Sequence, residues 1–299
     1  MLEESKQALD IRPEGTYLDC TFGRGGHSEV FLQSLSTRGC LYVIDQDAAA
    51  IEVAREKYAQ DERVTIVHNS FEDLSQIGEQ YNLLNKTDGI FFDLGVSSPQ
   101  LDEAERGFSF TQDGPLDMRM NNTQGQTAQQ WLAQCSESEL IDVLRNYGEE
   151  RYAKKIASQI MQAQQHQPLT GTLQLADIIK RCYPASYQGV HPATRSFQAI
   201  RIAVNRELDA LSRALEAAYQ LLKTSGRLAV ISFHSLEDRM VKRFIRDTLP
   251  KPLTKLPIPH QSALHLKPVG KLIRPSQEEI DSNPRSRSAR LRVAQKVFE

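Results

Sequence analysis

The chain has 299 residues and a net charge of −2, and its 40% hydrophobic and 25% charged residues are typical of an ordinary soluble globular protein. No apolar run approaches the roughly 20 residues of a membrane span, and the first residues lack the basic and apolar regions of a signal peptide. These features exclude a membrane protein, and we expect a cytoplasmic protein with no membrane partner.

The cysteine spacing and the charge distribution further limit the classes of protein to which the chain can belong. Cys20, Cys40, Cys135 and Cys182 lack Cys-x-x-Cys spacing, so neither a disulfide framework nor a zinc site is predicted. Residues 239–299 hold 14 lysines and arginines against 5 aspartates and glutamates. A basic tail on an acidic body is typical of an RNA contact or of a solvated face, and composition alone leaves both readings open.

A glycine loop, L-D-C-T-F-G-R-G-G-H-S at 18–28, lies between a predicted strand at 16–18 and a predicted helix at 28–35. Glycines let the backbone approach a ligand, and a helix N-terminus offers free N–H groups. The order of strand, glycine loop and helix is therefore typical of a nucleotide-type cofactor site. Asp45 ends the next predicted strand, 41–44, where an acidic residue would reach the ribose hydroxyls.

Two residues of this loop discriminate between cofactors. The dinucleotide fingerprint has a third glycine where this chain has Ser28, and a pyrophosphate disfavours the carboxylate of Asp19 at the strand end. S-adenosylmethionine carries an ammonium and a sulfonium, which suit a carboxylate. The loop therefore favours S-adenosylmethionine over NAD as the cofactor.

The first hundred residues alternate between short apolar runs and helical stretches. Further strands are predicted at 64–67 and 90–94, and a helix at 48–58. Such alternation indicates right-handed βαβ units and a parallel sheet, in which ligands bind at the carboxyl ends of the strands. Phe71 and Asp93 follow the third and fourth strands at that edge.

From about 101 to 203 the sequence shows helical periodicity and no convincing strand. Ser136 and Glu139 form a capping box for one helix, with Gly148 as its stop. Further helices are predicted through Tyr152, Ile156 and Ile160, through Leu175, Ile178 and Ile179, and through Arg195, Phe197 and Arg201. In the last of these, alternating arginine and aromatic residues indicate base stacking or core packing equally. A stretch this long cannot be a loop, so it is an inserted helical subdomain.

The sheet pattern then resumes with a helix at 207–222, a stop at Gly226 and a buried strand at 228–233. Residues 251–271 are rich in proline and lysine and predict an extended surface connection, and 291–297 predict an edge strand. We expect an α/β, Rossmann-like methyltransferase sheet built from 1–103 and 204–299, with the helical domain at 104–203 inserted.

The segment D-L-G-V-S-S-P-Q at 93–100 follows the fourth strand, where such methyltransferases hold the acceptor atom. Amine methylases that act on bases often carry an Asp/Asn/Ser-Pro-Pro-aromatic motif there, and Ser-Ser-Pro matches it in part; a turn that caps the next helix is the alternative. An exocyclic amine is a weak nucleophile, so the protein must orient it and accept its N–H hydrogens. Asp93, Ser97 and Ser98 are the candidates.

Two histidines are candidates for the same edge. His27 lies in the glycine loop, which predicts a cofactor contact, and His234 ends the last buried strand. Glu237 and Asp238 follow His234 closely, but no second histidine or cysteine pair with ligand spacing accompanies them. No metal is therefore predicted.

Several longer motifs of this chain resemble one known family across almost its whole length, the bacterial MraW (RsmH) methyltransferases. They are T-F-G-R-G-G-H-S at 21–28, D-L-G-V-S-S-P-Q-L-D at 93–102, E-R-G-F-S-F at 105–110, G-P-L-D-M-R-M at 114–120, H-P-A-T-R-S-F-Q-A-I-R-I at 191–202, S-F-H-S-L-E-D-R at 232–239 and N-P-R-S-R-S-A at 283–289.

The resemblance implies an S-adenosylmethionine-dependent enzyme that methylates the exocyclic N4 amine of a cytidine in the decoding region of 16S ribosomal RNA. The expected partner is that RNA or the small ribosomal subunit, and a homodimer is left open. The inserted helical domain is expected to help recognise the substrate. Two other classes remain as alternatives, a DNA amine methyltransferase and a non-catalytic RNA-binding protein.

The resemblance also implies a set of cofactor contacts. They are Gly25, Gly26, His27, Asp45, Phe71, Asp93 and Gln100. Family members usually begin with a short segment containing a His and a Val-Leu-Leu run, whereas this chain begins at the equivalent of its end. Because that strip is expected near the cofactor, its absence should affect activity more than fold.

Overall fold

The computed structural model describes residues 1–247 and 265–297. They divide into two compact units, which we call the sheet unit (Met1–Gly95 with Leu208–Glu299) and the helical unit (Val96–Glu207). The sequence placed the two breaks at 103/104 and 203/204. Among the described helices, none combines the length and the apolarity needed to cross a membrane.

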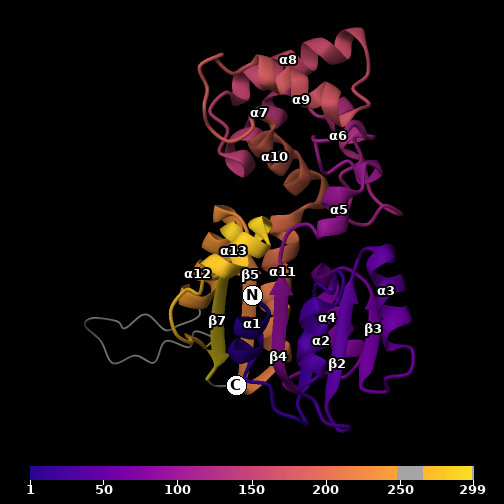
Figure 1. The fold of residues 1–299 in the computed structure, drawn as a ribbon, viewed down its shortest axis with the longest axis vertical. Helices are drawn as coiled ribbons and strands as arrows, with labels where there is room; N and C mark the ends of the chain where they lie inside the picture. The colour runs from indigo at the N-terminus through magenta and orange to yellow at the C-terminus, as the bar shows by residue number, and fades with distance from the viewer. Residues whose placement is uncertain (248–264, 298–299) are drawn as a thin grey trace, which may run out of the picture. The chain divides into compact units, whose positions relative to one another are not determined.

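The sheet unit is organised around one seven-stranded sheet of order β3-β2-β1-β4-β5-β7-β6 (Figure 1). The strands are β1 Thr16–Asp19, β2 Cys40–Asp45, β3 Val64–His68, β4 Thr87–Asp93, β5 Leu222–Ser232, β6 Leu266–Pro268 and β7 Arg290–Lys296. Strands β1 to β5 pair in parallel, whereas β7 runs antiparallel to both β5 and β6. The predicted Rossmann-like α/β class is confirmed.

Alternating side chains of the central strands supply two separate cores, one on each face of the sheet. Ile90 and Phe92 of β4 pack in one core with α4 and α11, and Phe91 packs in the other with α1 and α2. The helices of this unit are α1 Leu2–Leu9, α2 Gly26–Leu32, α3 Ala48–Tyr58, α4 Leu74–Gln80, α11 Glu207–Leu221, α12 Ser235–Asp247 and α13 Gln277–Ser282, with 3-10 turns η1 Phe71–Asp73 and η3 Pro284–Ser288. Burial on both faces explains why these strands are continuously apolar.

Three predictions about the C-terminal part are wrong. The final strand β7 is not an edge strand, because the short strand β6 pairs with its outer side. Strand β6 lies within the segment that was predicted to be an extended surface connection. Gly226 does not stop a helix but lies inside β5, where an added Cβ would approach the carbonyl oxygen of Thr87 to 2.8 Å. Residues 251–264 of the predicted connection lie outside the described residues.

The helical unit packs its helices around its own apolar core, which includes Leu144, Ile156, Ile160 and Ile179. Its helices are α5 Ser98–Asp102, α6 Ala128–Gln134, α7 Glu137–Gly148, α8 Ala153–His166, α9 Thr172–Arg181 and α10 Ala193–Asn205, with the 3-10 turn η2 Ala104–Arg106. Phe197 lies in this core, which settles its role as core packing.

Helix α7 begins at the predicted cap, but its C-cap lies one residue beyond Gly148, the predicted stop signal. The Ser136 hydroxyl accepts the N–H of Glu139 at 3.2 Å, as expected. Gly148 is instead the last helical residue, and Glu149 takes the left-handed cap conformation at φ 49°. Gly148 is needed because a Cβ there would lie 2.6 Å from the carbonyl oxygen of Arg195 in α10.

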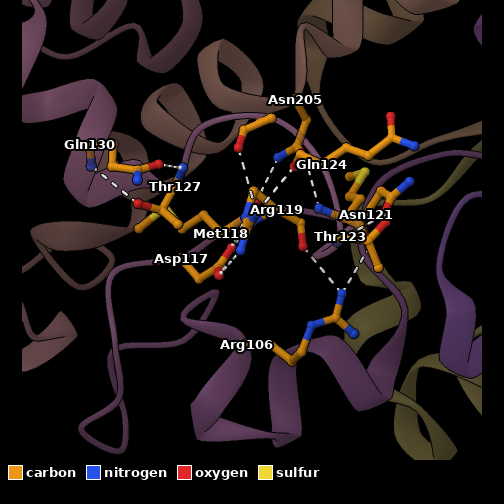
Figure 2. Close-up of polar contacts among 12 residues, drawn as sticks. Arg106, Asp117, Met118, Arg119, Asn121, Thr123, Gln124, Thr127, Gln130 and Asn205 are labelled. Atoms are coloured by element: carbon orange, nitrogen blue, oxygen red, sulfur yellow. Dashed lines mark hydrogen bonds and ion pairs between the residues drawn. The ribbon is translucent and has the colours of Figure 1, made fainter.

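A polar network, partly buried, holds the long connection between η2 and α6 (Figure 2). The Arg106 guanidinium donates to the carbonyl oxygens of Arg119 and Met120, at 3.2 and 2.9 Å. The Asn205 amide, at the end of α10, accepts from the Met120 N–H at 2.8 Å and donates to the Met118 carbonyl at 2.7 Å. Met118 is fully buried at φ 60°, so side-chain bonds maintain a backbone conformation that is rare for methionine.

Candidate cofactor site

The glycine loop turns sharply between β1 and α2. Gly25 is the N-cap of α2 at φ 78°, and an added Cβ would lie 2.6 Å from the ring of Phe22. Glycine is therefore required at this position both for its backbone conformation and for the space that it leaves. The strand–loop–helix order has the predicted form.

Asp19 holds this loop together from inside the protein. Its side chain is fully buried and accepts hydrogen bonds from the Ser28 hydroxyl at 2.6 Å and from the Thr21 N–H at 3.2 Å. Burial raises the pKa of this carboxyl to about 6. Asp19 is thus bonded to the loop from inside the protein, and a contact with the cofactor's ammonium stays a prediction. Ser28, which replaces the third glycine of the dinucleotide pattern, supplies one of its two donors.

Asp45 lies beside the loop at the end of β2, as its spacing predicted. One carboxylate oxygen accepts the Gly23 N–H at 2.8 Å, and the other accepts the Asp47 N–H at 2.9 Å. The Gln46 N–H is a third donor to this carboxylate, which leaves about one of its roughly four acceptor sites for a hydroxyl. Burial raises the pKa of Asp45 to about 6. Asp45 is thus oriented by the loop itself. Phe71, which follows β3, lies edge-on to Phe92, with the ring centroids 5.7 Å apart.

Asp93, at the end of β4, faces His27 of the loop. A carboxylate oxygen of Asp93 lies 3.5 Å from His27 Nδ1, and the His27 ring packs on Phe91 with a centroid distance of 4.6 Å. Burial and the neighbouring Asp19 carboxylate raise the pKa of Asp93 to about 7, whereas burial lowers that of His27 to about 4. The pair is therefore set for a neutral imidazole beside a carboxyl group that titrates near neutrality.

Two atoms of this pair lack hydrogen-bond partners among the described residues. Asp93 Oδ1 and His27 Nε2 are both buried and unsatisfied. Buried polar atoms without partners are costly, so such atoms indicate a place where a ligand's polar groups bind. A carboxylate oxygen suits an ammonium donor, so the residues present fit the methionine end of S-adenosylmethionine.

Sequence reasoning missed Thr21, which connects the loop to β4. The Asp93 N–H donates to the Thr21 hydroxyl at 2.6 Å. This bond fixes the backbone of Asp93 against the loop that carries His27. No local pattern could have indicated it, because the two residues are far apart in the chain.

His234 and Glu237 lie where β5 meets α12, one strand beyond Asp93. One Glu237 carboxylate oxygen accepts the N–H groups of Phe233 and His234, at 2.9 and 3.3 Å, and the other lies 3.1 Å from His234 Nε2. The Glu237 N–H donates to His234 Nδ1 at 3.5 Å and so helps to orient the imidazole, whereas His234 Nε2 makes no hydrogen bond within the described residues. Since Asp93 pairs with Ile231 in the sheet, His234 follows the strand that adjoins Asp93.

Asp238 does not join His234 and Glu237 in a metal-binding arrangement. Its carboxylate accepts from Arg292 at 2.7 and 3.1 Å and from Arg290 at 3.1 Å. Burial opposes the ionisation of Asp238, but the hydrogen bonds from Arg292 and Arg290 outweigh it and lower the pKa of this carboxyl. Two arginines of the basic tail, Arg290 and Arg292, are therefore structural residues of β7 that pair with Asp238.

Ser97, Ser98 and Gln100 belong to the helical unit and form the start of α5. The Gln100 side chain accepts the Ser97 N–H at 3.0 Å, and the Ser97 side chain accepts the Gln100 N–H. These two reciprocal bonds form a capping box. Ser98 is exposed, and Gln100 is buried. Locally, this segment has the helix-capping structure that the sequence left open as the alternative.

Comparison with known proteins gives a consistent result. Residues 1–297 match a family model described as the MraW methylase family. A protein named ribosomal RNA small subunit methyltransferase H from Hydrogenovibrio crunogenus is 52% identical, covering 99% of this chain and 95% of its own. Proteins of the same name from Nitrosococcus oceani and Idiomarina loihiensis are 53% and 50% identical, each covering 99% of this chain, and 95% and 96% of their own.

Proposed function

Because the chain belongs to the MraW methylase family, we propose that it methylates the exocyclic N4 amine of a cytidine in the decoding region of 16S ribosomal RNA. Its methyl donor is S-adenosylmethionine. The names of the relatives support a small-subunit RNA substrate. The observation that carries the proposal is the pair of buried, unsatisfied atoms on Asp93 and His27 at the end of β4.

We assign the cofactor contacts as follows. The backbone at Gly25 and Gly26 approaches the methionine end, Asp93 with His27 binds the ammonium, Asp45 accepts from the ribose hydroxyls and Phe71 contacts the adenine. Gln100 is included because the resemblance implies it. When bound, S-adenosylmethionine supplies a methyl group that is already activated, so no metal is needed.

Among the three catalytic candidates, Asp93 has the strongest support. Its pKa of about 7 leaves a carboxylate available near neutral pH to accept an N–H hydrogen of the amine and to keep the nitrogen in line for attack. The Ser97 side chain is already engaged in the capping box, whereas Ser98 is exposed. Both serines stay candidates for orienting the amine.

The decisive experiment transfers labelled methyl groups to small ribosomal subunits from cells that lack the gene, followed by nucleoside analysis. We expect N4-methylated cytidine in the RNA, and deproteinised 16S RNA in parallel shows whether assembly matters. Label in duplex DNA would instead identify a DNA amine methyltransferase. Binding without turnover would identify a non-catalytic RNA-binding protein. A ribosomal substrate also supports the cytoplasmic location expected from the sequence.

A further inference from the structure

Three half-buried tyrosines form a continuous aromatic cluster at one end of the helical unit. The ring of Tyr183 lies 4.6 Å from that of Tyr152 and 4.7 Å from that of Tyr187, measured between centroids. The cluster therefore joins the start of α8 to the segment that follows α9. Because each ring is only partly covered, aromatic surface remains for contact with another molecule.

A buried carboxylate fixes this cluster. Glu150 is 3% exposed, accepts the hydroxyl of Tyr183 at 2.6 Å and accepts the N–H of Tyr152 at 3.0 Å. The Lys155 ammonium donates to the carbonyl oxygen of Cys182 at 3.0 Å, which ties the start of α8 to the end of α9. Two tyrosines are thus held in place before any ligand arrives.

Four exposed cations lie within three residues of Tyr152 or Tyr183 in the sequence. Arg151 and Lys154 flank Tyr152, and Lys180 with Arg181 occupies the last turn of α9. Within the part of the chain that the structure describes, none of the four pairs with a carboxylate. By contrast, Arg201 of the same unit forms a bidentate ion pair with the Glu207 carboxylate.

The positions of two cations are unfavourable for the isolated protein. A helix C-terminus favours positive charge, which accounts for Lys180 and Arg181. Arg151 and Lys154 instead lie at the N-terminal end of α8, where the helix dipole repels cations. An anion bound there would relieve this repulsion, and it would also be attracted to the other cations.

We propose that this surface, the tyrosine face, binds a single-stranded segment of the RNA substrate, with unpaired bases on the aromatic rings and phosphates on the cations. It consists of Tyr152, Tyr183, Tyr187, Arg151, Lys154, Lys180 and Arg181. Alternating aromatic and basic side chains bind single strands because every base has a stacking face and every nucleotide carries a charge. The inference rests on the proposed function, from which it takes RNA as the substrate.

The first test removes the cations from the start of α8 in a double variant, Arg151→Ala with Lys154→Ala. Binding to deproteinised 16S RNA should weaken about tenfold, and its log–log salt slope should fall by roughly 1.4 for two lost phosphate contacts on a single strand. The melting temperature should stay the same or rise, since cations leave a helix N-terminus. Affinity for S-adenosylmethionine should not change.

The matched control is Arg38→Ala with Arg55→Ala, which removes two exposed charges from the sheet unit. If the control weakens RNA binding as much as the α8 variant does, general charge explains the effect and the proposal is overturned. Loss of affinity for assembled subunits but not for deproteinised RNA would overturn it too, by indicating a ribosomal protein as the partner.

The second test separates the aromatic contribution. Tyr187→Ala should weaken RNA binding roughly 5- to 150-fold, the cost of one lost base stack, while Tyr187→Phe should bind normally because stacking needs only the ring. Equal binding by wild type and Tyr187→Ala would contradict the stacking role. The RNA-binding and melting readouts involve no methyl transfer, so they stand apart from the methyl-transfer assay, whose failure would overturn the proposed function.

Discussion

The polar groups of the cofactor site and those of the tyrosine face are arranged in opposite ways. In the cofactor site, Asp19 and Asp45 accept hydrogen bonds from within the protein, and Asp19 is fully buried. In the helical unit, Arg151 and Lys154 are exposed and have no carboxylate partner among the described residues. A small ligand is bound by a few buried groups in fixed positions, whereas a polyanion is bound by exposed charges whose attraction depends on salt.

The strongest test of this contrast is Asp93→Ala. Since Asp93 is expected both to bind the cofactor and to accept an N–H of the amine, methyl transfer should fall at least about 100-fold. Single-turnover transfer of labelled methyl at saturating cofactor measures the chemical step. RNA affinity should be unchanged, and a variant that transfers methyl at the normal rate would remove Asp93 from the mechanism.

Asp238→Ala should produce the largest loss of stability. The substitution leaves Arg290 and Arg292 without their carboxylate partner. We expect the free energy of unfolding to fall by about 2–3 kcal/mol. This is less than the cost of breaking a fully buried ion pair, because Arg290 is 38% exposed. Denaturant unfolding measures this loss. Arg287→Ala, at an exposed position, is the control. If Asp238→Ala weakens RNA binding without loss of stability, then β7 arginines contact RNA after all.

Asp45→Ala should weaken binding of S-adenosylmethionine by about 1–3 kcal/mol, because hydrogen bonds to a charged acceptor are lost. Calorimetry measures the dissociation constant, and Asp45→Asn, which keeps one acceptor oxygen, should lose less. A dissociation constant that does not change in Asp45→Ala would show that the ribose is bound elsewhere.

The free energy of unfolding, measured by denaturant titration at a series of pH values, should depend on the buried carboxyl groups of the cofactor site. Asp93 has a folded pKa of about 7, and Asp19 and Asp45 about 6, against 3.8 for an unperturbed carboxyl. The folded state thus retains protons that the unfolded state has lost, so these groups favour folding most below about pH 4, and stability falls as pH rises toward 7.

Cofactor binding should respond in the opposite direction, because an ammonium prefers the ionised carboxylate. Affinity for S-adenosylmethionine should rise about tenfold from pH 6 to pH 8 if Asp93 must lose its proton. Calorimetry in buffers of different ionisation enthalpy should detect the released proton. In Asp93→Ala the dependence should flatten, and a flat profile in the wild type would contradict this role for Asp93.

The smallest effect should be the change in stability of Lys180→Ala. This exposed lysine favours its helix end only weakly, so the free energy of unfolding should change by less than about 1 kcal/mol. The same variant should still weaken RNA binding measurably. A large loss of stability would show that the tyrosine face is held together by its cations.

The elements of the sheet unit followed closely from the sequence where a local pattern encodes them. The helix predicted at 48–58 has those bounds as α3, and the apolar runs marked the first four strands to within three residues. Burial on both faces makes such strands continuously apolar, so they stand out without any knowledge of their partners. The spacing also placed Asp45 at the end of the strand beside the glycine loop, where its carboxylate accepts the Gly23 N–H, whereas its predicted contact with the ribose hydroxyls stays a prediction.

What failed depends on partners far away in the chain. The three residues of β6 include Pro268 and carry no strand signal of their own, and they are a strand only because β7 lies beside them. The charge count could not show that Arg292 bonds to Asp238, because the two residues lie on different elements. Nor could the sequence show that the Ser28 hydroxyl donates to Asp19.

The insertion of the helical unit between β4 and β5 has a consequence for how the chain folds. These strands are neighbours in the sheet, yet residues 96–207 separate them in sequence. Joining the ends of a flexible loop of roughly 110 residues costs on the order of 4 kcal/mol of chain entropy. If the inserted segment folds first, most of that loss is covered by its own contacts, including the bonds of Asn205 back to Met118 and Met120. During synthesis, strands β1 to β4 therefore emerge before the helical unit, and β4 lacks its partner β5 until that unit has been made.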